Sequence, residues 1–444
     1  MLCKMQKGSS LLIVLIGLSL NAILNAPEKG EQKELGRKCV SACIGGKHQQ
    51  LLWMQLWAGL EEQAIMGEPM SPVRLEVLSQ LQAHGIVAEY ITYPRVTLTS
   101  SSRLCVRHSP LGDTSRHTLT LLDPHMSPKE GDVPASWTIH QVQGALANPS
   151  RPLLAVRAGQ LAQIYDVDQR SLKNEWEFAH LIEYWVWLDA DTLAVVTEEN
   201  VFHWTVKRTR PRWKFSRHER LCGMEIVGYH RDANHVWMAL SALKLEQGQV
   251  VGLTQLYWRG GSLSQVIEAQ AVALPQHRFS RNPKPSTALL AAVRRGKERM
   301  GQFHAVELGP HQAGNAALLS ARGTLPFKGP WLGDFPSTVQ FLVHLGVAVI
   351  LTKHAFLFLA DVETAQTIHC IQLTCDIIFA TVIDDDRPHS LLGVCRSGKV
   401  LSISVCPCAL RQYLSHHPAS LSLSQRVLKL VGETSSQRTS IPVE

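Results

Sequence analysis

The sequence predicts an all-β fold of the propeller class, followed by the start of an α-helical linker. From about residue 90 to 405, short apolar runs alternate with turn residues, and long helical periodicity is missing. The turns recur at similar intervals: Gly159 and Glu199 are 40 positions apart, and His354 and Ser397 are 43 apart. A four-stranded propeller blade takes about 40–45 residues. Residues 85–405 therefore have room for about seven blades.

Hairpin-like units carry this prediction along the chain. The first contains a turn at Ala158-Gly159-Gln160, after which apolar residues alternate through Ile164, Tyr165 and Val167. The five units are residues 153–168, 192–206, 250–258, 349–368 and 391–405. Their strands are apolar on both sides, as expected where each blade packs between two others. Near the end, the spacing of Leu421, Leu428 and Leu430–Val431 suits one or two helical turns, with Ser424 as a possible cap.

The amino-terminal segment differs from the rest. An apolar run at 11–26 follows Lys4 and Lys7, as in a signal peptide or short anchor, although Pro27 makes a poor cleavage site. We interpret 1–69 as a divergent extension, or as sequence ahead of an alternative start at Met66 or Met70. Secretory or anchored targeting remains the alternative. The expected organisation is an extension (1–69), a propeller (70–411), and a linker start with a tail (412–444).

Composition and motifs argue against enzymes and metal proteins. The net charge of +7 is too small to identify nucleic acid as a partner, and the ten Cys include no C-x₂-C pair for zinc. "GVCRSGKV" (393–400) resembles a phosphate loop, but Val400 replaces the Ser or Thr that would hold Mg²⁺. No G-x-S-x-G elbow or Ser/His/Asp arrangement can be found. We expect no catalytic residues, no metal and no cofactor.

Several stretches resemble the amino-terminal propeller of the clathrin heavy chain family. They occur in the family's order with nearly constant offsets, and "PVRLEVLSQLQAHGI" (72–86) lies where the family's first residues would be. The matching stretches are residues 148–168, 193–206, 250–258, 334–341, 351–364 and 391–405. The resemblance covers about 70–431 and implies a seven-bladed propeller without enzymatic activity.

The resemblance also implies a function in clathrin-coated vesicles. It suggests a cytoplasmic protein, associated with vesicles or coated pits, that binds short apolar-acidic peptides of adaptor proteins in grooves between blades. Because the family's long helical leg has no counterpart here, we expect neither trimers nor light-chain binding.

The main groove of the family lies between its first two blades. Carried over by position, its wall falls on Leu154, Leu161, Gln163, Tyr165, Arg170 and Leu172. Gln163 would bond peptide backbone, Tyr165 would form the floor, and Arg170 would meet a ligand carboxylate. Leu161 replaces a family Thr and Leu172 a family Lys, although Lys173 is adjacent. We expect a more apolar groove with weaker acid selectivity. The alternative is that these residues only pack two blades together.

Two further family sites also have counterparts. A site for Trp-bearing motifs falls on Tyr93, Glu225, Val227 and Leu243, with Glu225 replacing a Gln. A groove for arrestin-like loops falls on Trp237, Leu256, Gly261, Leu263, Gln265 and Ile267, where Gly261 replaces an Arg. For both sets, ordinary core and turn positions are an equally good interpretation.

The segment 206–220, "VKRTRPRWKFSRHER", suggests a different function. It holds seven Lys or Arg residues against one Glu, with Trp213 among them. Such a surface would dock on anionic membrane or RNA. A solvated loop between blades is the simpler interpretation. A third possibility is a non-binding propeller retained from a truncated duplicate.

Overall fold

A computed structural model describes residues 71–93, 95–109, 117–126, 136–139, 142–296, 299–327, 333–415 and 423–428. The chain divides into two compact units, Met1–Met70 and Ser71–Glu444. The predicted extension (1–69), with its apolar run at 11–26, lies outside the described residues, as do 429–444. The predicted domain boundaries stay predictions. No helix among the described residues is long and apolar enough to cross a membrane.

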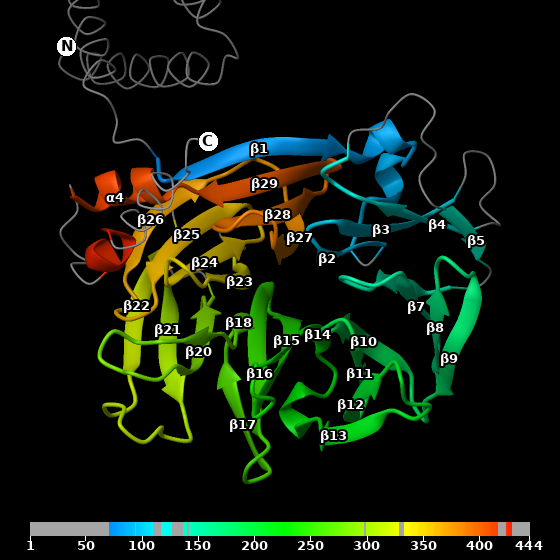
Figure 1. Cartoon of the computed structure of the whole chain (residues 1–444), viewed down its shortest axis with the longest axis horizontal. Helices are drawn as coiled ribbons and strands as arrows, with labels where there is room; N and C mark the ends of the chain where they lie inside the picture. Colours follow the sequence, from blue (N-terminus) through cyan, green and yellow to red (C-terminus); the bar gives the residue numbers. More distant parts are fainter. Residues whose placement is uncertain are drawn as a thin grey trace, which may run out of the picture. The chain divides into compact units, whose positions relative to one another are not determined.

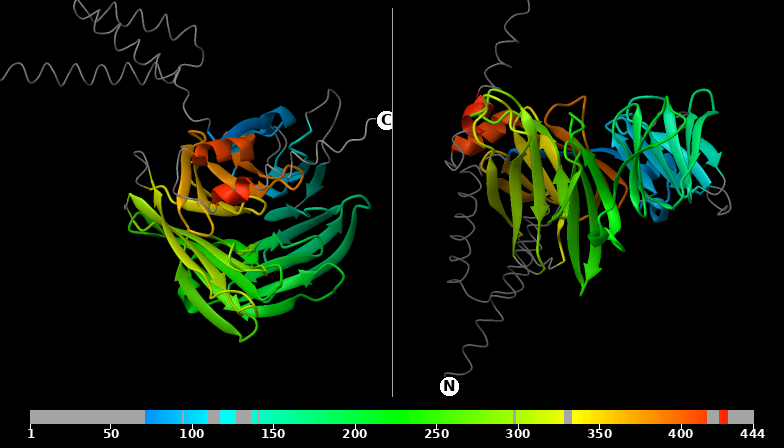
Figure 2. Two further views of the ribbon diagram at one scale, coloured as in Figure 1. Left: turned by 60° about the vertical axis from the view of Figure 1, so that its left-hand side comes forward. Right: turned by 90° about the horizontal axis from the view of Figure 1, so that it is seen from below.

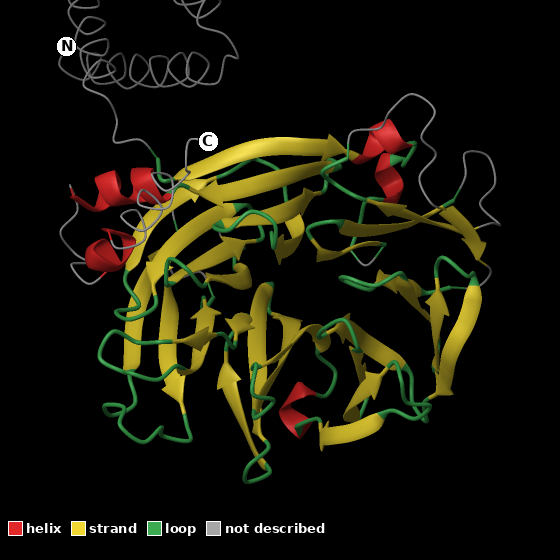
Figure 3. Ribbon diagram, in the orientation of Figure 1, coloured by secondary structure: helices red, strands yellow, loops and turns green. Residues whose placement is uncertain are grey.

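The second unit is a seven-bladed β-propeller, as predicted (Figure 1). Strands dominate it (Figure 3), since the described helices are short. Blade 1 holds β2 (Val96–Ser100), β3 (Arg103–His108), β4 (His117–Leu122) and β5 (Ser136–Ile139). Blade 2 holds β6 (Gly144–Ala147), β7 (Leu153–Ala158), β8 (Leu161–Asp166) and β9 (Ser171–Glu177). Blade 3 holds β10 (Ile182–Trp187), β11 (Thr192–Thr197), β12 (Asn200–Thr205) and β13 (Arg212–Ser216).

The remaining blades follow the same up-and-down order. Blade 4 holds β14 (Glu225–Arg231), β15 (Trp237–Glu246), β16 (Gln249–Trp258) and β17 (Leu263–Glu268). Blade 5 holds β18 (Ala271–Ala273), β19 (Gln276–His277), β20 (Ser286–Val293), β21 (Met300–Leu308) and β22 (Ser320–Pro326). Blade 6 holds β23 (Pro336–Leu342), β24 (Val347–Thr352), β25 (Phe356–Asp361) and β26 (Thr367–Gln372). Blade 7 holds β27 (Ile378–Ile383), β28 (Ser390–Cys395), β29 (Lys399–Val405) and β1 (Val73–Gln80).

The first strands of the blades surround the propeller axis. Contacts link β2 with β6 and β27, β14 with β10 and β18, and β23 with β18 and β27. The inner strands begin at one end of the axis. Tyr93, which shortly precedes β2, and Glu225, the first residue of β14, therefore lie at that end. Short 3-10 turns occur at Leu81–His84, Ala88–Tyr90 and Glu219–Leu221.

The ring is closed by the two ends of the propeller sequence. Strand β1 pairs antiparallel with β29 (Figure 1). In this register Val73 lies opposite Val405 and Gln80 opposite Lys399. The Cys406 N–H also donates to the Pro72 carbonyl at 2.9 Å. This pairing makes β1 the outer strand of blade 7.

The core lies between the blades, which explains the strands with apolar residues on both sides. All six residues of β24 and all six of β25 are buried. The blades approach so closely that a Cβ added at Gly323 of β22 would lie 1.7 Å from the Ala365 carbonyl oxygen. A glycine is therefore required at this contact between blades 5 and 6.

The chain becomes helical after blade 7, as predicted. Helix α4 (Pro407–Ser415) buries Leu410 and Leu414, and a helical turn at 423–428 buries Leu423 and Val427. These side chains join the apolar cluster of blades 6 and 7. Figure 2 shows both helical pieces (red) at the edge of the ring.

Two local predictions are wrong. Residues 250–258 are not a hairpin, because they form the single long strand β16. The segment 206–220 is not simply a loop, because it contains β13, the outer strand of blade 3. The hairpin prediction for 391–405 is confirmed as β28 and β29, so a strand follows the glycine turn that resembles a phosphate loop.

Candidate functional site: the faces between blades

Five of the predicted groove residues lie on one face of blade 2. The registers place Tyr165 of β8 opposite Leu154 of β7 and opposite Leu172 of β9. Gln163 and Leu161 follow on the same side of β8, because side chains alternate along a strand. Leu154 and Tyr165 pack in an apolar cluster with Leu119 and Trp137 of blade 1. The face is therefore the one that blade 2 turns toward blade 1.

Burial separates packing residues from accessible ones on this face, which we call the blade 1–2 face. Leu154 is buried, whereas Leu161, Gln163 and Tyr165 are half-buried. Leu172 is 44% exposed. The face thus offers an accessible apolar edge at Leu172 above a partly covered aromatic ring.

The amide of Gln163 is already hydrogen-bonded. The Tyr165 hydroxyl donates to Gln163 Oε1 at 3.1 Å, and Gln163 Nε2 donates to Glu175 Oε2 at 3.2 Å. The sequence analysis missed Glu175. A bulge between Ile164 and Tyr165 skips one residue of β9, which moves Glu175 opposite Gln163. A peptide that bonds the amide must compete with this carboxylate.

Both cations predicted near the groove are exposed, but one of them is already paired. Arg170 lies in the turn between β8 and β9 with φ of 50°, is exposed, and has no ion pair with any residue that the structure describes. Lys173 instead bonds Gln169 at 2.8 Å and Asp166 at 3.3 Å. Lys173 is therefore a poor substitute for a cation at position 172, and Arg170 is the stronger candidate for an acidic ligand.

The second predicted set lies at the end of the axis where the inner strands begin. Glu225 of β14 is opposite Leu243 of β15, and Val227 occupies an adjacent register shift. Burial and Glu225 raise the pKa of Tyr93 to about 12, while Arg157 opposes the rise. Tyr93 and Glu225 of blade 4 are therefore close enough to interact, although Tyr93 is 48% exposed.

The third predicted set lies on the face of blade 4 that turns toward blade 5. Trp237, Leu256, Leu263, Gln265 and Ile267 share this face by register, and Leu256 packs with Leu289 of blade 5. Sequence reasoning missed Trp258, which stacks on Trp237 with ring centroids 6.1 Å apart. A Cβ at Gly261 would lie 2.6 Å from the Trp258 ring, so a larger residue there would move the indole. Exposed Leu263 is the accessible member of the set.

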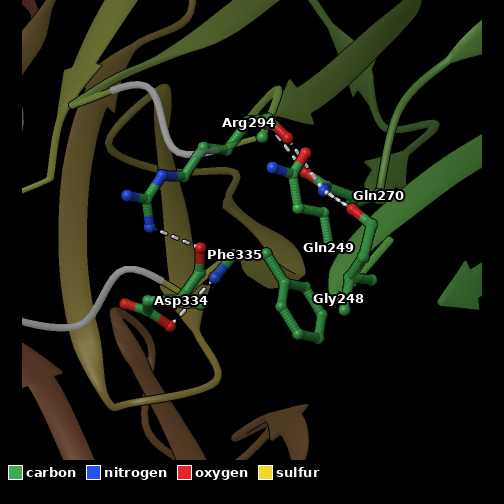
Figure 4. Close-up of a pocket in the computed structure, with 9 residues that line it drawn as sticks. Gly248, Gln249, Gln270, Arg294, Asp334 and Phe335 are labelled. Carbon is green, nitrogen blue, oxygen red and sulfur yellow. Dashed lines mark hydrogen bonds between the residues drawn. The ribbon is translucent and has the colours of Figure 1, made fainter. Parts of the chain in front are cut away.

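A small cavity lies elsewhere, where the tip of the β15–β16 hairpin meets blades 5 and 6 (Figure 4). Its volume is about 90 Å³, and none of the predicted site residues lines it. Arg294 Nη1 donates to the Asp334 carbonyl at 2.6 Å, and Gln270 Nε2 donates to the Arg294 carbonyl at 3.0 Å. These polar groups bond one another, and the bond from Arg294 to Asp334 links blade 5 to the segment that precedes blade 6. Among the described residues no group of three or more His, Cys, Asp or Glu could hold a metal ion.

Comparison with known proteins identifies related chains. No family model matches this sequence. It is 30% identical over 336 residues to "Clathrin heavy chain 2" of Homo sapiens, covering 75% of this chain and 20% of that protein. It is 28% identical over 341 residues to "Clathrin heavy chain" of Drosophila melanogaster, covering 77% and 20%. The chain spans about a fifth of the length of these relatives.

One solved structure is a more distant match. A chain in "Crystal Structure of Mitotic Checkpoint Complex" aligns with a TM-score of 0.47 and 13% identity, covering 75% of this chain and 91% of that one.

Proposed function

The chain is a clathrin-heavy-chain-like protein with a propeller similar to the amino-terminal one of that family, and from this premise we propose that it binds short extended peptides of adaptor proteins in vesicle-mediated transport. The blade 1–2 face carries this proposal. Its cross-strand row Leu154–Tyr165–Leu172 lies close in sequence to Arg170, which is exposed and has no ion pair with any described residue. The proposed place of action is the cytoplasmic side of coated vesicles or coated pits, and the role is non-catalytic.

The proposed chemistry is that of weak peptide recognition. Apolar ligand side chains would contact Leu172, Leu161 and the Tyr165 ring, while Arg170 would bond a terminal acidic residue through its guanidinium. Glu175 places a negative charge beside Gln163 and lowers the preference for acidic ligands. Single motifs would bind weakly, and several motifs in one adaptor would raise the overall affinity.

Titration of a fluorescent peptide of the form Leu-φ-x-φ-Asp against the whole chain tests this proposal. Arg170→Glu and Leu172→Asp are expected to weaken binding about tenfold or more, because one reverses the cation and the other places a carboxylate on the apolar row. The control is Lys207→Glu, which changes an exposed cation outside this face. Unchanged binding in both variants would contradict the proposal, as would no binding at millimolar peptide.

The two other sets are proposed as further peptide-binding faces. For the set Trp237, Leu256, Leu263, Gln265 and Ile267, the accessible Leu263 is the residue to change. Leu263→Asp should remove binding of an apolar loop peptide there while leaving binding at the blade 1–2 face unchanged. A loss at both faces would instead indicate a general loss of folding.

A basic surface supports a second candidate function, docking on an anionic membrane. Lys214 of β13 lies near three arginines. Burial lowers the pKa of Lys214, and the charges of Arg259, Arg212 and Arg231 lower it further. Arg231 is paired with Asp189 at 2.7 Å, whereas Arg212 and Arg259 have no ion pair among the described residues. Trp213 in the same strand is 56% exposed.

Flotation with anionic vesicles tests this second candidate. Binding should fall steeply with salt and be lost in Arg212→Glu and Arg259→Glu. Binding to RNA rather than vesicles would identify nucleic acid as the partner instead. Absence of binding to peptide, vesicle and RNA would favour a non-binding propeller.

A further inference from the structure

Three arginines of blades 1 and 2 gather near Tyr93, at the end of the axis where the inner strands begin. Arg95 precedes β2, and the Arg107 N–H of β3 donates to the Arg95 carbonyl at 2.8 Å. Arg157 of β7 lies opposite Gly144 of β6. Its guanidinium lies 5.7 Å from the centre of the Trp185 ring and donates to the Ile182 carbonyl. We call Arg95, Arg107 and Arg157 the arginine cluster.

The charges of the arginine cluster are not compensated by ion pairs. None of the three arginines is paired with a carboxylate among the residues that the structure describes. Within the same residues, Nε of Arg107 and Nε of Arg157 are buried without a hydrogen-bond partner. Burial lowers the pKa of the Arg107 guanidinium, and the nearby charges of Arg95 and Arg157 lower it further. The three guanidinium groups are therefore close enough to repel one another. Partly buried cations without a counter-charge are costly to a folded protein.

One carboxylate that acts on this region is that of Glu225. Glu225 raises the pKa of the Tyr93 hydroxyl and Arg157 lowers it, so both charges lie near the same ring. Three guanidinium groups and one carboxylate leave about two positive charges. A phosphomonoester carries about −1.5 to −2 charges at neutral pH, and guanidinium forks match its oxygens.

We propose that the arginine cluster binds a phosphomonoester group carried by a peptide segment. The cluster is recessed, because each of its arginines is only partly exposed, so a side chain that enters it fits better than a flat membrane surface. The exposed Tyr93 ring would contact the peptide next to the phosphate. This proposal adds a ligand chemistry to the predicted site at Tyr93 and Glu225, and it does not require binding at the blade 1–2 face.

The test measures binding of the whole chain to a short phosphoserine peptide, its unphosphorylated form and inorganic phosphate. The phosphopeptide should bind at least tenfold more tightly than the unphosphorylated form. Inorganic phosphate should compete, but more weakly than the phosphopeptide. Equal affinities for the phosphopeptide and inorganic phosphate would overturn the peptide part of the proposal. Tighter binding to vesicles containing phosphatidylinositol 4-phosphate would identify a lipid headgroup and overturn it as well.

Variants with opposite expected effects make the test specific. Arg107→Gln should weaken phosphopeptide binding about tenfold, whereas Glu225→Gln should tighten it several-fold because it removes the nearby carboxylate. Glu225 is exposed, so this second variant is informative even if Arg107→Gln does not fold. Arg103→Gln, at the other end of β3, is the matched control and should not change binding. Equal losses in Arg107→Gln and Arg103→Gln, or no tightening in Glu225→Gln, would refute the proposal.

Discussion

Arg426 Nη1 lies 2.8 Å from Glu363 Oε1, which joins the helical turn at 423–428 to the turn between β25 and β26. Ser280 of blade 5 bonds the same carboxylate through its N–H at 2.8 Å, and His277 lies 3.7 Å away. Burial alone would raise the pKa of Glu363, but His277, Ser280 and Arg426 together lower it to about 2. One carboxylate thus connects blades 5 and 6 to the carboxyl-terminal helical turn.

Acid should therefore loosen this helical turn. A carboxylate with a lowered pKa stabilises the folded state above its ordinary value of 4.5, and this stabilisation is lost as the pH falls from about 4.5 toward 2. We expect the protection of the amides at 423–428, after correction for the intrinsic pH dependence of exchange, to fall over this range. Glu363→Gln should show fast exchange already at pH 6, while Arg411→Gln, on the exposed side of α4, should not. Equal protection at pH 6 and pH 3 would rule out this role of Glu363.

Removing the charge of Glu175 should strengthen the binding of acidic peptides at the blade 1–2 face. Glu175→Gln keeps an acceptor for Gln163 but eliminates the repulsion of a ligand carboxylate. We expect a gain of about two- to fivefold, measured by fluorescence anisotropy, that shrinks at high salt. Glu198→Gln, in the exposed turn of blade 3, provides the control. An equal gain in both variants would mean that only net charge matters.

Gly323→Ala should destabilise the propeller strongly. The new methyl group would collide with the Ala365 carbonyl, a backbone atom that cannot rotate away. We expect a loss of about 2 to 4 kcal/mol in the free energy of unfolding, measured by urea denaturation. Gly333→Ala is the matched control, since a Cβ there meets no atom within 4 Å. A loss below about 0.5 kcal/mol for Gly323→Ala would show that the two blades separate easily.

His203 should make the free energy of unfolding depend on pH between about 7.5 and 5.5. Its ring bonds the Tyr229 hydroxyl at 2.7 Å, and burial, Lys214, Arg231 and His235 lower the pKa of His203 to about 3. The unfolded chain binds a proton below about pH 6.5, whereas the folded chain does not, so stability falls as the pH drops below 6.5. Between pH 7.5 and 5.5 this residue alone accounts for about 1 kcal/mol. In His203→Gln the difference in unfolding free energy between these pH values should shrink by that amount, and an unchanged difference would contradict the assignment.

Local sequence patterns predict much of this propeller because most of its strand pairings are local. The turn at Gly159, with φ of 63°, and the alternation that follows it are enough to predict β7 and β8. The pairing of β1 with β29 joins segments more than 300 residues apart, and the resemblance of 72–86 to the family placed it at the start of the propeller without revealing its partner.

The candidate sites were harder to predict, because they depend on register and on charges from separate blades. Glu175 reaches Gln163 through a bulge that strict alternation along β9 does not predict. The basic character of 206–220 concealed the strand β13, whose buried Phe215 stacks on Tyr257 of blade 4. The arginine cluster combines Arg95, Arg107 and Arg157, which no motif connects.

The pairing of β1 with β29 also determines when the ring can close during biosynthesis. Strand β1, the outer strand of blade 7, is made first, but its partner β29 is complete only when Val405 has left the ribosome. During synthesis β1 waits with an unsatisfied edge that can pair with other chains. Premature termination before β29 would therefore yield an open, aggregation-prone array of blades rather than a smaller working propeller.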